Sequence, residues 1–352
     1  MIKIVYVSEG FITKKDIYDR DIPNRILQMN DISPVEFAFT EDKAALEQEG
    51  EMRKANLRLE KEGPDWVNHS EQFLNDIKDA DIAIIHYSGA GKQFFDAAKN
   101  LKLLCVMRSG VENVNLEEAK KHGVTVCYSP GRASEPVADF TLTLMLALMR
   151  RLPYNNIAGT GKWRAGAPMG SEGMMQGATV GLFGFGMIAQ KVAKRLQGFG
   201  CNIITYDPWA NKQAIEKYNV ELVDNIEDLF KRADYVSVHA RLTNDNKGII
   251  DEKLLGLMKP TAYLINTARA GLVNQKDLIK VLEDKKIAGA ALDVFESEPL
   301  EDNHPFLTLD NVIITPHVAG NGGDFIIRSI ESPINEIRHF LKNEKYDFEC
   351  KK

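Results

Sequence analysis

The sequence has few cysteines, and their spacing excludes two classes of site. Its 352 residues include four cysteines, which lie far apart and form no Cys-x-x-Cys pair. This spacing provides no disulfide framework and no cysteine-based metal site. We therefore predict buried thiols in a reducing compartment and no bound metal.

Long apolar runs are also missing. The most apolar helical stretch, Phe140 to Met149, is much shorter than the ~20 residues that a membrane-spanning helix needs. The first residues, Met1 to Val7, are typical of a short strand rather than of a secretion signal. We expect a cytoplasmic protein without a membrane partner.

The sequence has no excess of basic residues. Lys and Arg number 44 against 50 Asp and Glu, so the net charge is −6. The sequence therefore lacks the overall positive charge that is typical of nucleic-acid-binding proteins. The apolar content of 44% is sufficient for a large core, and a length above ~300 residues favours two domains. We predict two globular domains and no nucleic-acid partner.

What the sequence does contain is a repeated alternation of short apolar runs with helical segments. Strand-like runs occupy residues 2–7, 35–39, 82–85, 103–106, 124–128, 179–183, 203–206, 220–223, 235–239, 262–266, 288–294 and 312–314. This alternation specifies an α/β fold with parallel sheets covered on both faces. The charged stretch 41–62 is expected to be a solvated helix. Because residues 325–343 contain Pro333, they predict two helices or one kinked helix.

The stretch from Ala178 to Asp207 carries a phosphate-binding fingerprint. An apolar strand ends at the pattern Gly184-x-Gly186-x-x-Ala189, a helix follows, and a second strand ends in Asp207. Glycines at these places allow a tight turn and bring backbone N–H groups close to a pyrophosphate at the start of the helix. A carboxylate about 20 residues further on can bind the adenosine ribose and would repel a 2′-phosphate. The pattern predicts a Rossmann domain that prefers NAD to NADP.

Three polar residues downstream are placed at the ends of predicted strands. Arg269 directly follows one strand, Glu298 lies in a turn after the next, and His317 closes the last. Histidine is the natural proton donor to a ketone oxygen, and a carboxylate beside it favours the protonated form and fixes the tautomer. Arginine binds a carboxylate through two hydrogen bonds. Singly, each has an ordinary structural explanation, but three at successive strand ends point to a catalytic site.

Two glycine-containing turns in the first part also follow strands. They comprise residues 86–91 and 108–113, and both are candidates for a substrate wall because ligands of α/β sheets bind outside the carboxyl ends of strands. Spacing alone leaves plain connecting turns equally open.

Several motifs together make the chain resemble the D-2-hydroxyacid dehydrogenases, a family that includes phosphoglycerate dehydrogenase and glyoxylate/hydroxypyruvate reductase. The matching segments are VGLFGFGMIA, YDP, VSVHARLT, INTARAG, LDVFESEP and TPHVAG. The resemblance extends over about residues 101–343 and implies an oxidoreductase that interconverts a small 2-oxo acid and a D-2-hydroxy acid with NAD.

The resemblance also implies roles for individual residues. It assigns catalysis to Arg269, which orients the substrate, to Glu298, and to His317 as the general acid/base. The implied substrate wall consists of Tyr87, Ser88, Ser109 and Gly110 together with Arg269. The implied cofactor contacts are Gly184, Gly186, Met187, Ile188, Asp207, Ala240, Thr267, Ala268, Arg269, Asp293, His317 and Gly320.

The family architecture implies a discontinuous arrangement of the two domains. A Rossmann NAD-binding domain at residues 109–320 is expected to be inserted into a flavodoxin-like substrate-binding domain formed by residues 1–108 and 321–352. Family members are usually dimers through the helix near residues 137–150, so a homodimer is expected. The apolar character of that helix also agrees with core packing alone.

Departures from the family pattern bear on the substrate. Tyr87 stands where phosphoglycerate dehydrogenases tend to have an arginine, which weakens the case for phosphoglycerate. Arg108 or Arg132 could meet a phosphate or a sugar acid instead, although each is also explained as an ordinary surface cation. The alternative function is an NAD(H)-sensing binding protein similar to the CtBP-type corepressors, which resemble the same family.

Overall fold

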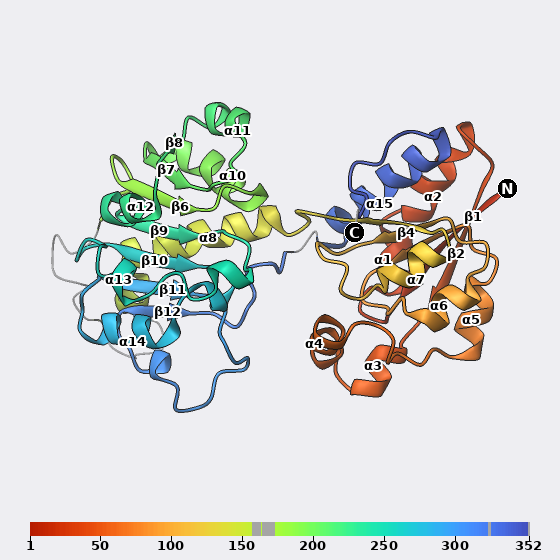
Figure 1. The fold of residues 1–352 in the computed structure, drawn as a ribbon, viewed down its shortest axis with the longest axis horizontal. Helices are drawn as coiled ribbons and strands as arrows, with labels where there is room; N and C mark the ends of the chain where they lie inside the picture. The colour runs from red at the N-terminus through yellow and green to blue at the C-terminus, as the bar shows by residue number, and fades with distance from the viewer. Residues whose placement is uncertain (157–162, 164–172, 323–324, 351–352) are drawn as a thin grey trace. The chain divides into compact units, whose positions relative to one another are not determined.

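The chain folds into two compact α/β units (Figure 1). The computed structural model describes residues 1–156, 163, 173–322 and 325–350. Unit 1 comprises Met1–Arg132 and Gly323–Lys352, and unit 2 comprises Ala133–Gly322. None of the helices in the described residues is both long and apolar enough to cross a membrane.

Unit 1 is built on a five-stranded parallel sheet in the order β2-β1-β3-β4-β5. This is the strand order of flavodoxin-like folds. The strands are β1 (Ile2–Ser8), β2 (Val35–Glu41), β3 (Ile82–Ile85), β4 (Leu103–Val106) and β5 (Thr125–Tyr128). The helices are α1 (Lys14–Asp19), α2 (Ile22–Leu27), α3 (Ala44–Glu49), α4 (Met52–Glu62), α5 (Glu71–Ile77), α6 (Lys92–Ala97), α7 (Leu116–Lys121) and α15 (Phe325–Lys342), with a 3₁₀ turn η1 (Gln28–Asp31).

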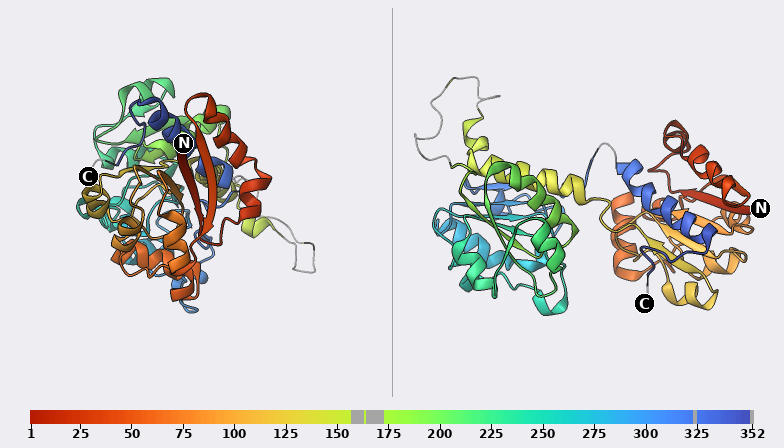
Figure 2. Two further views of the ribbon diagram at one scale, coloured as in Figure 1. Left: turned by 90° about the vertical axis from the view of Figure 1, so that its right-hand side faces the viewer. Right: turned by 90° about the horizontal axis from the view of Figure 1, so that it is seen from above.

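Both faces of this sheet are covered because its short strands are apolar on both sides. All four residues of β3 and of β4 are buried. Helices α5, α6 and α7 pack on one face, whereas α1, α2 and α15 pack on the other. Figure 2 shows that α15, which is close to the C-terminus, lies beside the strands formed by the N-terminal part of the chain in unit 1. It forms one helix that contains Pro333 rather than two helices, and the predicted kink at this residue stays a prediction.

Unit 2 contains a seven-stranded parallel sheet in the order β12-β11-β10-β9-β6-β7-β8. Its order reverses between β6 and β9, as in Rossmann folds. The strands are β6 (Thr179–Phe183), β7 (Asn202–Tyr206), β8 (Glu221–Leu222), β9 (Tyr235–Val238), β10 (Tyr263–Asn266), β11 (Gly289–Leu292) and β12 (Val312–Ile314). The helices are α8 (Ser134–Met149), α9 (Leu152–Asn155), α10 (Met187–Leu196), α11 (Lys212–Lys217), α12 (Ile226–Arg232), α13 (Glu252–Leu255) and α14 (Gln275–Glu283), and the 3₁₀ turns are η2 (Gln197–Phe199), η3 (Asn244–Asn246), η4 (Ala270–Leu272) and η5 (Pro305–Leu307).

Helix α8 has most of its apolar surface in the core of unit 2. It packs with α10 on one face of the sheet, while α12, α13 and α14 cover the other. Nine residues of α8 are buried, including Val137 and Met145. Core packing within one chain therefore explains most of its apolar character.

The boundary between the units differs from the one that the sequence predicted. Residues 109–132 were expected in the nucleotide domain, but they belong to unit 1. The physical reason is β5, which pairs in parallel with β4 at the edge of the five-stranded sheet. The return to unit 1 occurs after Gly322 rather than after Gly320.

The charged stretch 41–62 forms two helices rather than one. Gly50 ends α3 with φ of 70°, a left-handed conformation that interrupts an α-helix, and Glu51 is extended before α4 begins. Nor are the two helices wholly solvated, because Ala55 and Leu59 of α4 are buried against α3.

Candidate active site and dinucleotide site

The glycine turn after β6 is held against the loop that follows β9. Gly184 has φ of +91°, and a Cβ on it would lie 2.7 Å from the backbone nitrogen of Ala240. Only glycine fits this close approach without strain. The turn therefore lies at the point where the strand order reverses, which is where α/β sheets bind ligands.

Gly186 is placed differently, at the start of α10. It is the N-cap residue, with ordinary φ and ψ of −73° and −166°, and a Cβ built on it would meet nothing within 4 Å. The N–H groups of the first turn of α10 have no partner within the helix and can bind an anion. Ala189, one turn further on, is fully buried and packs α10 against the sheet. This open, N–H-lined space fits a dinucleotide pyrophosphate.

Asp207 lies beside this turn at the end of β7. Its carboxylate accepts hydrogen bonds from the backbone N–H groups of Phe185 and Trp209, each at 2.8 Å. These contacts fix the carboxylate next to the glycine turn, where its remaining lone pairs can bind a ribose diol. The position fits the adenosine half of NAD.

Gly186→Ala is expected to weaken NADH binding at least about tenfold while leaving the fold intact, because the added methyl group enters the phosphate space. The melting temperature should not change, since φ of −73° suits alanine. A titration of NADH fluorescence measures the affinity.

The matched control is Gly198→Ala near the other end of α10. Its added Cβ would also meet nothing within 4 Å, and it lies away from the phosphate turn. It should bind NADH normally. Equal affinity of the Gly186→Ala variant and the unmodified protein would contradict the phosphate assignment.

Three predicted site residues follow three neighbouring strands. Arg269 comes after β10, Asp293 after β11 and His317 after β12, and these strands pair in parallel in that order. Their carboxyl ends therefore lie at one edge of the sheet in unit 2.

His317 and Glu298 form the predicted pair. Nδ1 of His317 lies 2.9 Å from Oε2 and 3.1 Å from Oε1 of Glu298. Oε1 also accepts the N–H of Phe295 at 3.0 Å, so the carboxylate is oriented by its own loop. Because a carboxylate only accepts, Nδ1 carries the donated proton and Nε2 is the nitrogen left for a substrate. The His317 side chain is 48% exposed.

Asp293 holds the turn that presents His317. Its fully buried carboxylate accepts three hydrogen bonds, from the Thr315 hydroxyl at 2.6 Å and from the N–H groups of Val318 and Ala319 at 2.9 and 2.8 Å. His317 itself has φ of 54°, an uncommon conformation for a residue other than glycine. These three hydrogen bonds, which we call the Asp293 clamp, were not predicted from the sequence. The predicted contact of Asp293 with the nicotinamide amide stays a prediction.

Arg269 lies on an exposed turn whose backbone is held by hydrogen bonds from the side chain of Asn266. The buried side chain of Asn266 accepts the N–H of Ala268 at 3.0 Å and donates to the carbonyl of Arg269 at 3.1 Å. The hydroxyl of Thr267 is 2.9 Å from that of Thr141 on α8. Nη1 of Arg269 donates to the Ala268 carbonyl at 2.8 Å. Asn266 and Thr141 were missed because neither residue type is distinctive until the turn is seen.

The predicted substrate residues of unit 1 also lie at strand ends. Tyr87 and Ser88 follow β3, and Ser109 and Gly110 follow its neighbour β4. The Ser88 side chain is buried, and its hydroxyl has no hydrogen-bond partner among the described residues. The Glu112 carboxylate packs directly against Gly110.

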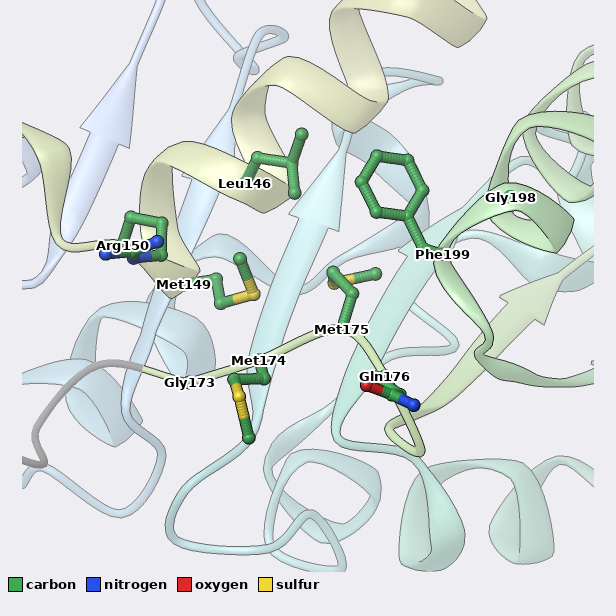
Figure 3. Close-up of a pocket in the computed structure, with 9 residues that line it drawn as sticks. All are labelled: Leu146, Met149, Arg150, Gly173, Met174, Met175, Gln176, Gly198 and Phe199. Carbon is green, nitrogen blue, oxygen red and sulfur yellow. The ribbon is translucent and has the colours of Figure 1, made fainter.

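A separate cavity of about 350 Å³ lies in unit 2 at the end of α8. Figure 3 shows Leu146, Met149, Met175 and Phe199 directed into the space between α8 and the segment before β6. None of the predicted site residues lines it.

Comparison with known proteins identifies the family of the chain. Residues 142–319 match the NAD binding domain of the D-isomer specific 2-hydroxyacid dehydrogenases. The chain is 42% identical over 250 residues to D-3-phosphoglycerate dehydrogenase of Methanocaldococcus jannaschii, covering 70% of this chain and 47% of that protein. It is 39% identical over 290 residues to glyoxylate reductase of Thermofilum pendens, covering 80% and 85%. The chain thus spans about half the length of the first relative and most of the second.

The fold is also shared with solved structures. The NAD-complexed D-isomer specific 2-hydroxyacid dehydrogenase of Lactobacillus delbrueckii ssp. bulgaricus superposes with a TM-score of 0.78 at 22% identity, covering 99% of this chain and 100% of that one. The chain belongs to the D-isomer specific 2-hydroxyacid dehydrogenases, a family of oxidoreductases with an NAD-binding domain.

Proposed function

We propose that this protein is an NAD-dependent D-2-hydroxyacid dehydrogenase that reduces a small 2-oxo acid and runs the reverse oxidation. The observation that carries the proposal is the His317–Glu298 pair, with Nδ1 and Oε2 2.9 Å apart. It lies on the sheet edge that also presents Arg269. A proton donor and a carboxylate-binding cation on one edge are what carbonyl reduction of a 2-oxo acid requires.

His317 is the proposed general acid. Its Nε2 holds the proton that passes to the carbonyl oxygen, and Glu298 stabilises the imidazolium and keeps Nδ1 protonated throughout. NADH supplies the hydride when it is bound. In the oxidative direction, Nε2 takes the proton of the substrate hydroxyl instead.

Arg269 is the proposed substrate anchor. Its exposed guanidinium can form two parallel hydrogen bonds with the substrate carboxylate and draw electron density from the adjacent carbonyl. The hydrogen bonds of the Asn266 side chain with the N–H of Ala268 and the carbonyl of Arg269 hold the turn from which the arginine projects.

The proposed cofactor site follows the carboxyl edge of the seven-stranded sheet. Asp207 is placed to favour NAD over NADP, because its carboxylate would repel a 2′-phosphate. The other proposed contacts are Gly184, Gly186, Met187, Ile188, Ala240, Thr267, Ala268, Arg269, Asp293, His317 and Gly320. In unit 1 the proposed substrate wall comprises Tyr87, Ser88, Ser109 and Gly110.

The relatives' names support small 2-oxo acids as substrates. They include a glyoxylate reductase of Thermofilum pendens and a hydroxypyruvate reductase of Thermotoga maritima. We accordingly propose a reaction of the same class and no requirement for a metal.

NADH oxidation with a panel of 2-oxo acids tests the proposal. Glyoxylate, hydroxypyruvate, phosphohydroxypyruvate and sugar-derived 2-oxo acids are each mixed with protein and NADH, and absorbance at the NADH band is followed. Turnover with at least one of them is expected. Tight NADH binding without turnover of any would contradict the proposal and support an NAD(H)-sensing protein instead.

A homodimer in the cytoplasm is a further part of the proposal. Phe140 and Leu146 of α8 remain partly exposed, and Leu146 lines the cavity of Figure 3. A partly uncovered apolar surface of this kind suits a subunit contact.

A further inference from the structure

The segment 346–350 lies against the edge strand of the sheet in unit 1. After α15 the chain turns back (Figure 2), and this segment pairs with β5. The N–H of Tyr128 donates to the Phe348 carbonyl at 3.1 Å, and the N–H of Cys350 donates to the Val126 carbonyl at 2.8 Å. Because β5 is the outermost strand of its sheet, these hydrogen bonds cover backbone groups that an edge strand leaves open.

Glu336 of α15 joins this segment to the helix. Its side chain is buried, with 1% exposed, and its carboxylate accepts the N–H groups of Phe348 at 3.0 Å and of Asp347 at 3.2 Å. His339 follows one turn later on the same face of α15. One potential ligand atom from each of Glu336, His339 and Asp347 therefore lies within 4.8 Å of the other two.

This cluster contains more negative than positive charge. Within the described residues, neither Glu336 nor Asp347 forms an ion pair with a lysine or an arginine. The cationic group that lies near Glu336 is the imidazole of His339, whose Nδ1 is 3.5 Å from Oε2. Since a buried carboxylate is costly without a cation, the cluster suits a positively charged ligand.

Nδ1 of His339 points independently to a metal ion. This atom is buried and has no hydrogen-bond partner among the described residues. Its distance of 3.5 Å from Oε2 of Glu336 is long for a hydrogen bond. Two ligands that each lie about 2.1 Å from a tetrahedral zinc ion are about 3.4 Å apart. The spacing therefore suits two ligands of one ion better than a donor and its acceptor.

The chemistry of the donors selects the kind of ion. Zinc binds imidazole nitrogen and carboxylate oxygen, and a water molecule can take its fourth position. Calcium and magnesium prefer oxygen ligands alone. The backbone N–H groups that orient Glu336 also fit this role, because ligating carboxylates are usually held by hydrogen bonds of their own. No cysteine belongs to the cluster, so the spacing of the cysteines gave no sign of it.

A second cluster in unit 1 lacks these properties. It consists of Asp96, Glu118 and His122. Lys92 forms an ion pair with Asp96, and Lys121 forms one with Glu118. Nδ1 of His122 lies 2.9 Å from the carbonyl oxygen of Glu118. Because its carboxylates and its ring nitrogen already have partners, this second cluster is not expected to bind a metal and provides a control.

We propose that Glu336, His339 and Asp347 bind a divalent transition-metal ion of the zinc type, which ties the segment 346–350 to α15 and holds it against β5. The role of the ion is structural. None of its three ligands is among the residues proposed to bind NAD or the substrate, so this inference does not depend on the proposed function. It is also compatible with a reaction that requires no metal.

Titration with zinc tests the site. Protein freed of metal by a chelator is titrated with ZnCl₂ in a calorimeter, and one tightly bound ion per chain is expected. His339→Gln should weaken binding at least about tenfold, and it should fold because Nδ1 has no hydrogen bond to lose among the described residues. His122→Gln is the matched control and should bind zinc as the unmodified protein does. Calcium that binds as tightly as zinc would overturn the inference.

Amide hydrogen exchange tests whether the ion holds the segment 346–350. Zinc at about 100 times its dissociation constant should slow exchange of the Phe348 and Cys350 N–H groups at least about tenfold. The same slowing is expected in His122→Gln and none in His339→Gln. Exchange that does not respond to zinc in the unmodified protein would contradict the structural role.

A second variant keeps the test decisive if His339→Gln does not fold. The exposed side chain of Asp347 forms no hydrogen bond or ion pair with the described residues, so Asp347→Asn removes a ligand without disturbing the fold. Zinc affinity that is unchanged in this variant would overturn the inference. Either failure leaves the proposed dehydrogenase intact, because turnover of 2-oxo acids is measured separately and does not involve these residues.

Discussion

Replacement of His317 by alanine is expected to lower kcat by about 100- to 10,000-fold for every 2-oxo acid that the protein reduces. The reason is that Nε2 of this ring is the proposed proton donor, and Glu298 holds the opposite nitrogen at 2.9 Å. The variant should still bind NADH, because it loses only one of the proposed cofactor contacts, and the phosphate turn and Asp207 are unaffected. Stopped-flow hydride transfer and NADH fluorescence measure the two quantities.

A matched control is available in unit 1. His122 is likewise paired with a carboxylate, with Nε2 3.2 Å from Oδ1 of Asp96, and its side chain is 25% exposed. His122→Ala should leave kcat unchanged. Near-normal turnover in His317→Ala would mean that another group supplies the proton and would remove the basis of the proposed mechanism.

The parallel sheets could be predicted because their signals are local. Most strands from 179–183 to 312–314 are short apolar runs between turns, and buried parallel strands have that pattern. The boundary after residue 108 was wrong because it depended on which sheet β5 joins. Pairing with β4 is a tertiary choice that the run 124–128 does not encode by itself.

Some residues of the candidate site could likewise be found from the sequence, whereas others are recognised only in the folded structure. Arg269 and His317 could be found from the sequence because each directly follows a strand, and the strand ends of a parallel sheet meet at one edge. The burial of Arg108 could not be predicted from the sequence, because its guanidinium contacts Glu60, which lies 48 positions earlier in the chain. The role of Asp293 was also hidden, because its three donors come from a turn whose shape is known only after folding.

Asp293→Ala is expected to cost about 2–5 kcal/mol of the unfolding free energy of unit 2. It leaves the N–H groups of Val318 and Ala319 without their acceptor, and each lost buried partner costs about 1–3 kcal/mol. Thermal and urea unfolding measure the change. Asp251→Ala is the comparison, because that carboxylate accepts the N–H of Leu254 at the start of α13 and its loss should cost about 0.5–2 kcal/mol.

Measurement of kcat for Asp293→Ala distinguishes a residue that positions His317 from one that only stabilises the fold. Without the clamp, the turn is free to release His317 from its φ of 54°, and a displacement of about 1 Å can lower a rate 100-fold. We therefore expect kcat of Asp293→Ala to fall at least tenfold at temperatures well below unfolding, whereas Asp251→Ala keeps its kcat. A stability loss with normal kcat would show that the turn holds its shape unaided. A fall confined to NADH affinity would assign the carboxylate to the nicotinamide amide instead, because a residue that only positions His317 acts on proton transfer and leaves cofactor binding unchanged.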